Sequence, residues 1–332
     1  MKLTCDFCYR MCEIEEGSRG YCGIRECREG EIITVHYGYL LAAAVDPIEK
    51  KPMYHFCPGD KTLSAALFGC NYTCSFCQNH DISQRTSPLF PASRKQLRGE
   101  YTSPRQLVSR MDECGVSIMS YTYSDPVVWQ DYMLDTARLV HEQGGLNCMV
   151  TNGSFSAQSL ERVLPLIDGI NIDVKGDEQF YQTYCKAELS PVLRAVEACA
   201  RRPGTVLEVT TLLIEGIHTL EEVRAMGQLL FNAGVQVWHL SRFFPHYRME
   251  DRRSTSEAYL DEAIEVAGEC RIPYVYGGNS TNPEHSITRC PTCGTQVITR
   301  RGYYVRVQRE LQHSMLMNMC TGCGERIYGK FR

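Results

Sequence analysis

The sequence predicts an α/β protein in which parallel strands alternate with helices, arranged as a sheet or a barrel. Seven short apolar runs with the lengths of strands recur through the middle of the chain. The segments between them carry recognisable helix starts, and a strand–helix–strand order repeated this often requires parallel pairing. The chain has 332 residues, which allows roughly two domains, or one large domain with appendages.

The predicted elements follow one another in a regular order. The strands are the apolar runs at residues 63–68, 117–123, 146–150, 169–174, 206–213, 235–240 and 273–276. Ser103 followed by Pro104 marks one helix start, since serine is a good N-cap and proline suits the first helical position. Thr219 and Glu222 have the spacing of a capping box and mark another.

Polar residues follow the carboxyl ends of these predicted strands. In β/α barrels those ends form the rim on which active sites are built, so we expect a functional site there. The alternative is that these are ordinary polar β/α loops. The residues concerned are Cys70, Tyr123, Ser124, Asp125, Asn152, Asp173, Lys175, Ser241 and Arg242.

Composition excludes several classes of protein. Lys and Arg number 35 against 39 Asp and Glu, a net charge of −4, which excludes a histone-like polycation and a disordered acidic chain. The longest apolar stretch, residues 39–45, is far shorter than the ~20 residues of a membrane span. The N-terminus has no apolar signal core, so we expect a cytoplasmic protein. Charge is uneven, because residues 289–332 carry 8 basic and 2 acidic side chains.

The 18 cysteines are the unusual feature of the composition. In a chain without a secretion signal, clustered cysteines favour metal or redox chemistry over disulfides. Seven are scattered, and most of these fall on apolar faces typical of small core residues. The other eleven form three groups: Cys5, Cys8, Cys12 and Cys22; Cys70, Cys74 and Cys77; and Cys290, Cys293, Cys320 and Cys323.

The middle group, Cys70-x3-Cys74-x2-Cys77, lies directly after the first predicted strand. Three thiolates in one short loop can each hold one iron of a cubane cluster, leaving the fourth iron open to another ligand. A zinc site is the alternative, and it requires a fourth ligand such as His80.

This motif, with the aromatic Phe76 before its last cysteine, resembles the signature of the radical S-adenosylmethionine (SAM) superfamily. The resemblance implies that SAM binds the open iron of a [4Fe–4S] cluster. It also implies that reductive cleavage of SAM gives a 5′-deoxyadenosyl radical, which abstracts hydrogen from a substrate. Cys70, Cys74 and Cys77 would then be the catalytic ligands.

Further residues are carried over from the same resemblance. Tyr123-Ser124-Asp125-Pro126 resembles a variant of the strand end that holds the methionine ammonium, with Asp125 in place of glutamate. Thr151-Asn152-Gly153 and Asp173-x-Lys175 resemble elements of pyruvate formate-lyase activating enzymes, where the lysine helps to hold the methionine carboxylate. An ordinary strand-end ion pair is the alternative for Asp173 and Lys175. Ser241 and Arg242 suit ribose hydroxyls or a substrate anion, with a surface arginine as the alternative.

The closest resemblance is to the radical SAM enzyme of the AmmeMemoRadiSam system. It extends over essentially the whole chain and includes PIEKKPMYHFCPG (47–59), YTYSDP, HLSRFFP, YVYGGN (274–279) and the terminal CPTCG. It implies a partial (β/α)6 barrel of the TIM type at residues 60–286, between an N-terminal cysteine-rich module (1–59) and a C-terminal module (287–332). It also implies partners of the Memo and Amme types, besides a reductant such as flavodoxin or ferredoxin. The charged segment 46–55 either covers the site or is a solvated connection.

The two flanking cysteine groups suggest further metal sites. Cys290, Cys293, Cys320 and Cys323 resemble the two knuckles of a zinc ribbon, whose closed tetrahedral site is structural; rubredoxin-type iron or a cluster is the competitor. Cys5, Cys8, Cys12 and Cys22 fit zinc or an auxiliary cluster; their spacing does not decide between the two, zinc is slightly preferred, and Cys27 is an alternative ligand. The basic C-terminal module suits RNA or an acidic partner, although a ribbon docked on the acidic body is favoured.

The leading hypothesis is a radical SAM enzyme that acts on a partner protein or peptide. Radical chemistry on a small metabolite or RNA is the first alternative. A non-catalytic zinc and nucleic-acid-binding protein is the second, and the three-cysteine loop disfavours it because three thiolates alone leave a zinc site incomplete.

Overall fold

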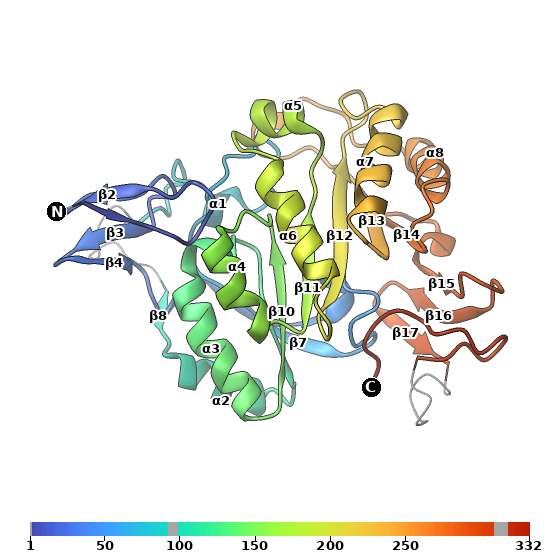
Figure 1. Ribbon diagram of the computed structural model, residues 1–332, viewed down its shortest axis with the longest axis horizontal. Coiled ribbons are helices and arrows are strands. Elements are labelled where there is room, and N and C mark those ends of the chain that lie inside the picture. Colours follow the sequence, from blue (N-terminus) through green and yellow to red (C-terminus); the bar gives the residue numbers. More distant parts are fainter. Residues whose placement is uncertain (1, 92–98, 309–317) are drawn as a thin grey trace.

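The computed structural model describes residues 2–91, 99–308 and 318–332. Its centre is a mixed α/β unit built on one large, mostly parallel sheet (Figure 1). The order of its eight strands is β14-β13-β12-β11-β10-β9-β7-β6. All neighbours pair in parallel except β6 and β7, so the sheet is open between β14 at one edge and β6 at the other.

The seven parallel strands coincide with the seven predicted ones, and that prediction is confirmed. They are β7 (Lys61–Ala66), β9 (Ile118–Tyr121), β10 (Leu146–Thr151), β11 (Gly169–Asp173), β12 (Val206–Leu213), β13 (Val237–Arg242) and β14 (Tyr274–Gly278). The edge strand β6 (Ala42–Pro47) was not predicted as a strand, although it overlaps the longest apolar stretch of the sequence. Near-continuous apolar runs are expected of parallel strands, because helices or other segments cover both of their faces.

The helices between the strands begin where the sequence indicates. Ser103 caps α2 (Pro104–Glu113) and Thr219 caps α7 (Leu220–Asn232), each in a complete capping box. The remaining helices are α1 (His80–Ser83), α3 (Gln130–Glu142), α4 (Ala157–Val163), α5 (Glu178–Phe180), α6 (Ser190–Ala200) and α8 (Glu257–Gly268). In the described part of the chain, no helix has both the length and the apolar character required to cross a bilayer.

Most of the segment after β6 is buried. The sequence suggested either a cover over the site or a solvated connection for this segment, and neither interpretation predicts its burial. It begins with a 3-10 turn, η1 (Ile48–Lys50), and the main-chain N–H groups of Tyr54 and His55 donate to Glu208 of β12 at 2.9 and 2.7 Å. Lys51 is only 1% exposed and pairs with Asp46 at 2.7 Å. Asp46, Glu49 and Lys51 therefore belong to the interior, where each charge requires a partner, whereas Lys50 is exposed.

Small antiparallel sheets stand at both ends of the chain. The N-terminal residues form β1 (Lys2–Thr4) with β2 (Glu13–Glu15), and β3 (Arg25–Arg28) with β4 (Glu31–Thr34). Farther along, β5 (Tyr39–Leu40) pairs with β8 (Glu100–Tyr101). The C-terminal tail, which we define as residues 287–332, forms β15 (Thr288–Arg289), β16 (Gln296–Arg301) and β17 (Tyr304–Val307) beside β14 (Figure 1).

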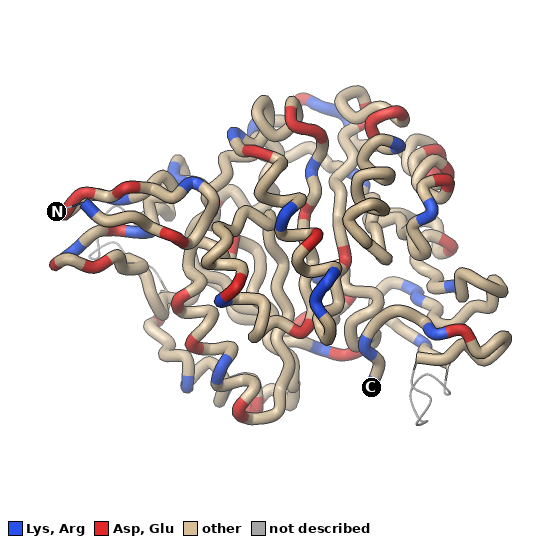
Figure 2. Tube along the Cα trace, in the orientation of Figure 1, with Lys and Arg blue, Asp and Glu red and all other residues tan. Residues whose placement is uncertain are grey.

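The tail docks on the body of the protein, as the sequence favoured. Val297 and Ile298 share an apolar cluster with Tyr274 and Tyr276 of β14. Acidic residues line α8 nearby (Figure 2). Some of the basic residues of the tail form ion pairs with the body of the protein. These pairs are Arg289–Glu284 (2.7 Å), Lys330–Asp168 (3.4 Å) and Arg332–Asp60 (2.6 Å).

Candidate active site

The three-cysteine loop lies at the carboxyl edge of the sheet, between β7 and α1. Gly69 opens it with φ +118°, and a Cβ there would lie 2.4 Å from Cγ1 of Ile24, so only glycine fits. The Gly69 carbonyl accepts a 3.0 Å hydrogen bond from the N–H of Asp125. The loop is thus fixed both to the end of β9 and to the N-terminal segment.

Hydrogen-bonding groups surround the sulfurs of this loop. Cys70 Sγ accepts from the N–H of Tyr72 at 3.3 Å and from Nδ2 of Asn152 at 3.7 Å. Cys77 Sγ lies 3.2 Å from the hydroxyl of Ser83. Burial raises the pKa of both thiols when no metal is bound. Donors aimed at buried sulfur stabilise thiolates, which is the form that ligates iron, so the loop fits an iron–sulfur cluster.

The loop lacks the convergence of a site for one ion. Among the described residues, only the tail cysteines bring three or more ligand atoms together in that way. Thiolates that bind different irons of one cluster stand farther apart than thiolates on one ion. His80, the fourth ligand that the zinc alternative requires, stacks on Tyr247 at 4.5 Å and pairs with Asp81 through Nε2 at 3.2 Å, while its Nδ1 is buried without a hydrogen-bond partner in the described part of the chain.

A short π-helical turn, η5 (Tyr181–Cys185), supports the loop from behind. The N–H of Thr73 donates to the Cys185 carbonyl at 3.1 Å, and the N–H of Ser75 donates to the Tyr184 carbonyl at 3.0 Å. A hydrogen bond with the thiol of Cys185, together with burial, raises the pKa of Cys74 well above its usual range. Single π turns of this kind occur often at functional sites.

Asp125 joins the end of β9 to the end of β10. Its Oδ1 accepts from the N–H of Val127 and the hydroxyl of Thr151, both at 3.0 Å, and its Oδ2 accepts from the N–H of Asn152 at 2.8 Å. Burial outweighs these donors and raises the pKa of Asp125 to about 6. The carboxylate is thus a positioning group for the rim, whereas the sequence suggested only a contact with the methionine ammonium.

Lys175 lies on the same rim, near the cysteine loop. Its Nζ is 2.8 Å from Oδ2 of Asp173, so the predicted pair is also an ion pair. Burial acts to lower the pKa of Lys175, but the charges of Asp173 and Cys74 raise it well above its usual value. His218, stacked on Phe180, lies 2.9 Å from the Lys175 carbonyl and fixes this loop. A permanently charged ammonium is thus held beside the cysteines.

Three other predicted cofactor contacts have their side chains engaged inside the protein. Phe76 packs on Phe180 with ring centroids 5.6 Å apart. The Ser124 hydroxyl donates to the Leu67 carbonyl and accepts from the indole of Trp129. The Tyr123 hydroxyl donates to Asp46, while its carbonyl accepts from Nδ2 of Asn79 at 2.9 Å. These residues can therefore contact a ligand mainly through their main-chain atoms.

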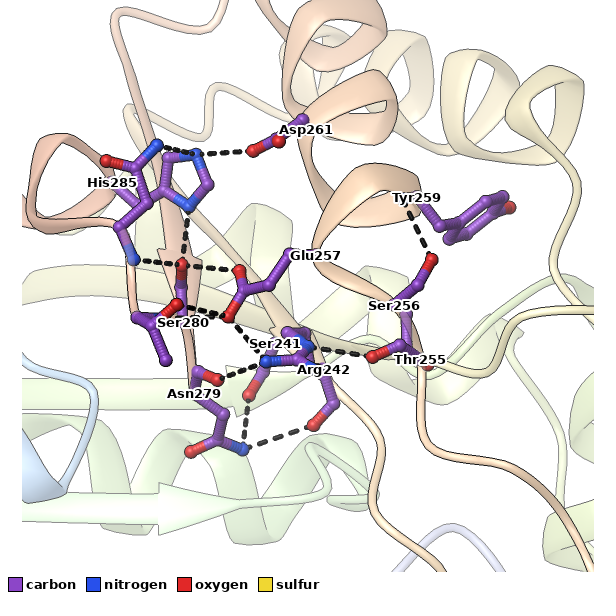
Figure 3. A network of polar contacts seen from close by, with 12 residues as sticks. Ser241, Arg242, Thr255, Ser256, Glu257, Tyr259, Asp261, Asn279, Ser280 and His285 are labelled. Atoms are coloured by element: carbon purple, nitrogen blue, oxygen red, sulfur yellow. Dashed lines mark hydrogen bonds and ion pairs between the residues drawn. The ribbon is translucent and has the colours of Figure 1, made fainter.

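Ser241 and Arg242 lie in a different network, at the end of β13 (Figure 3). The Arg242 guanidinium pairs with Glu257 at 2.5 Å and donates to the Thr255 carbonyl at 2.7 Å. Ser241 Oγ accepts from Nδ2 of Asn279 at 3.1 Å. The alternative of an ordinary surface arginine therefore does not hold for Arg242. Its guanidinium N–H groups already donate to other residues of the protein.

The sequence did not single out Asn71, Arg10 or Cys185 as site residues. Asn71 Oδ1 accepts from Nδ2 of Asn152 at 2.9 Å, and Arg10 donates to the Asn71 carbonyl at 3.3 Å. Asn71 stands between two cysteines of the motif, and that position was its only signal. Cys185 was grouped with the scattered core cysteines, and Arg10 carries no motif at all.

The four tail cysteines form the site best suited to one ion. The Sγ atoms of Cys290 and Cys323, and those of Cys293 and Cys320, are 3.6 Å apart, and all four lie within 4.8 Å of one another. A tetrahedron with metal–sulfur bonds of about 2.3 Å has sulfurs about 3.8 Å apart. This agreement favours a mononuclear site over a cluster and applies equally to zinc and iron.

A mostly parallel sheet with a buried three-cysteine loop on its carboxyl edge defines an α/β metalloenzyme. The chain belongs to the radical SAM superfamily, since the model of that family matches residues 66–230. A protein described as uncharacterized, from Methanocaldococcus jannaschii, is 36% identical over 98% of this chain and 95% of its own length. Membership implies a [4Fe–4S] cluster and SAM, as the sequence resemblance indicated.

The fold is similar to that of a solved radical SAM-type structure at a TM-score of 0.50. Streptococcus suis SuiB bound to S-adenosylmethionine matches with a TM-score of 0.50 and 9% identity, over 70% of this chain and 53% of that one. A domain of a pyruvate-formate lyase-activating enzyme from Bacteroides vulgatus matches with a TM-score of 0.42 and 15% identity, over 48% and 98% respectively.

Proposed function

We propose that this enzyme binds SAM on a [4Fe–4S] cluster held by Cys70, Cys74 and Cys77, and uses it to abstract hydrogen from a partner protein or peptide. When bound, the cluster supplies one electron to the sulfonium; the S–C5′ bond breaks to give methionine and a 5′-deoxyadenosyl radical, which takes a hydrogen atom from the substrate. The donors around Cys70 and Cys77, on the same rim as Lys175, are the observation that carries this proposal.

The residues of the rim have distinct tasks in this proposal. Asn152 orients the Cys70 thiolate, and η5 holds the loop around Cys74. Lys175, whose side chain is 14% exposed, offers a cation for the methionine carboxylate. Asp125 fixes the rim through Thr151 and Asn152, and the Tyr123 and Ser124 backbone lies beside it for the ammonium. Phe76 packs on Phe180 and so helps to fix the loop that carries the cysteines.

The experiment is anaerobic reconstitution followed by reduction with dithionite in the presence of SAM. The wild-type enzyme is expected to form 5′-deoxyadenosine. Replacement of Cys70, Cys74 and Cys77 together by alanine is expected to abolish that product and to remove about four irons. An unchanged iron and sulfide content in this variant contradicts the assignment of the cluster to these cysteines.

The finer family assignment is also a proposal. We infer from the motifs quoted above that the enzyme is the radical SAM component of an AmmeMemoRadiSam system, with Memo-type and Amme-type partners and a flavodoxin or ferredoxin as reductant. The open sheet of seven parallel strands supports its description as a partial (β/α)6 barrel. The tail is proposed to be a zinc ribbon. Anaerobic incubation with candidate partners, followed by peptide mass mapping, tests whether a protein is the substrate.

A further inference from the structure

The N-terminal cysteines form a compact group that the proposed reaction does not use. The N–H of Cys5 donates to the Cys12 carbonyl at 2.8 Å, and a Cβ on Gly20 would lie 3.6 Å from Cys12 Sγ. Cys5, Cys8 and Cys22 are each less than 9% exposed, whereas Cys12 is half-buried. Burial, and to a smaller extent the thiols of Cys22 and Cys5, raises the pKa of Cys8 to about 12.

The spacing of these four sulfurs separates two kinds of metal site. The tail shows what a four-cysteine site for one ion looks like in this chain, with all sulfurs within 4.8 Å. Among the described residues, only the tail cysteines converge as ligands of one ion; Cys5, Cys8, Cys12 and Cys22 do not, and neither do Cys70, Cys74 and Cys77. Thiolates shared among several irons are farther apart than thiolates on one ion. The N-terminal group thus resembles the Cys70 loop more than the tail site, which favours a cluster over zinc.

The group also touches the first cluster loop. Arg10, two residues after Cys8, donates to the Asn71 carbonyl at 3.3 Å. The side chain of Asn71 accepts from Asn152, whose amide lies 3.7 Å from Cys70 Sγ. The segment around Cys8 is thus bonded to the residue that follows Cys70. Tyr9, next to Cys8, donates through its N–H to the Ser154 carbonyl at 3.0 Å and fixes this approach.

We propose that Cys5, Cys8, Cys12 and Cys22 hold a second iron–sulfur cluster, adjacent to the Cys70 loop. Its ligand Cys12 is half-buried, whereas Cys8 is buried and lies two residues before Arg10, which bonds to the Cys70 loop. This arrangement suits a centre that receives an electron from a one-electron reductant protein and lies beside the SAM cluster. The assignment of a cluster to these cysteines is independent of the proposed function. Only its role as the entry point for electrons rests on the proposed function.

Inorganic sulfide is the measurement that decides, because a mononuclear tail site contains none. The full chain is reconstituted anaerobically with iron and sulfide in three forms: wild type, Cys70/Cys74/Cys77→Ala, and Cys8/Cys22→Ala. We expect each variant to keep about half of the wild-type sulfide, if both clusters are of the four-iron type. The first variant should also keep the electron paramagnetic resonance signal of a reduced cluster.

Combining the five substitutions should remove all sulfide. Adding Cys27→Ala to the Cys70/Cys74/Cys77→Ala variant is the matched control and should leave sulfide unchanged, because Cys27 Sγ instead faces Glu16 at 3.5 Å. Absence of sulfide in the Cys70/Cys74/Cys77→Ala variant, with Cys8/Cys22→Ala at the wild-type level, overturns the second cluster and leaves the proposed function standing. If instead the sulfide content falls in Cys8/Cys22→Ala and not in Cys70/Cys74/Cys77→Ala, the proposed function is overturned and the N-terminal cluster is supported. If a variant fails to fold, wild-type sulfide of about four per chain instead of about eight is sufficient to reject the second cluster.

Discussion

The guanidinium of Arg300 in the tail donates to the main-chain carbonyl of Tyr54 at 2.7 Å and lies 4.0 Å from the centroid of the Tyr54 ring. Arg300 is almost fully buried and also donates to the Ser286 carbonyl at 2.9 Å. Tyr54 belongs to the segment whose N–H groups bind Glu208 in the central sheet. The tail is therefore bonded to the interior of the protein, through a segment more than two hundred residues away in sequence.

Arg300→Ala is expected to lower the free energy of unfolding by about 3–5 kcal/mol, because the Tyr54 carbonyl loses its donor and buried Glu49 loses its cation and keeps the N–H of Gly59 as a donor. Chemical denaturation measures this change. Arg289→Ala is the matched control, since Arg289 forms an exposed pair with Glu284 and such pairs contribute about 0–1 kcal/mol. Equal effects of the two substitutions would show that the buried contact does not hold the tail.

Lys175→Ala is expected to weaken SAM binding to the reconstituted enzyme roughly tenfold to a hundredfold. A hydrogen bond to a charged group contributes about 1.5–3 kcal/mol, and Lys175 is the cation on the rim that we assign to the methionine carboxylate. Equilibrium binding of SAM measures the loss. Lys61→Ala, at the exposed start of β7, is the control and should bind as wild type. Unchanged affinity in Lys175→Ala would remove Lys175 from the cofactor site.

Asp125→Asn is expected to destabilise the protein by about 1–3 kcal/mol. In the wild type both carboxylate oxygens accept from main-chain N–H groups, so in the variant the amide N–H₂ must face one of these donors and that donor loses its acceptor. The wild-type protein should also show a pH dependence that the variant lacks. Since the pKa of Asp125 is raised to about 6 in the folded state, its contribution is largest below the unfolded value near 3.8 and is lost as the pH rises through 6. Between pH 5 and 7.5 this loss is about 1 kcal/mol.

Denaturant unfolding at both pH values, in wild type and variant, isolates this contribution. A parallel pH dependence in the two proteins would mean that Asp125 titrates at its ordinary pKa when folded, which contradicts its burial. A variant of wild-type stability that has lost SAM binding would instead restore the direct contact with the methionine ammonium that the sequence suggested.

The sequence was sufficient to predict the seven parallel strands, the two capping boxes and the cysteine loop, because each depends on residues close together in the chain. Ser103 and Gln106, for example, close their capping box over three residues. The burial of Lys51 was not predictable, since it depends on its ion pair with Asp46 and on the ring of Tyr123, which lies just after β9. Nor was the enclosure of Arg242, whose partner Glu257 begins α8. The module boundaries at 59/60 and 286/287 stay a prediction.

Cys293→Ser is expected to remove the tail metal, because three thiolates and a hydroxyl bind a soft ion far less well than the four thiolates that now lie within 4.8 Å. Residues 286–332 should then become sensitive to protease, since a short tail without its metal has little apolar area to hold its fold. The contacts of Arg300 add a second consequence: global stability should fall as well, although the metal is distant in sequence from the central sheet.

Metal analysis, limited proteolysis and 5′-deoxyadenosine formation with dithionite together test this prediction. SAM cleavage should persist at a temperature where the variant stays folded, because Cys70, Cys74 and Cys77 belong to another loop at the carboxyl edge of the sheet. Cys114→Ser, at an exposed cysteine outside all three groups, is the control and should change none of the three measurements. A Cys293→Ser protein that keeps its metal and a protease-resistant tail yet no longer cleaves SAM would identify the tail site as catalytic or electron-transferring, in conflict with its closed coordination.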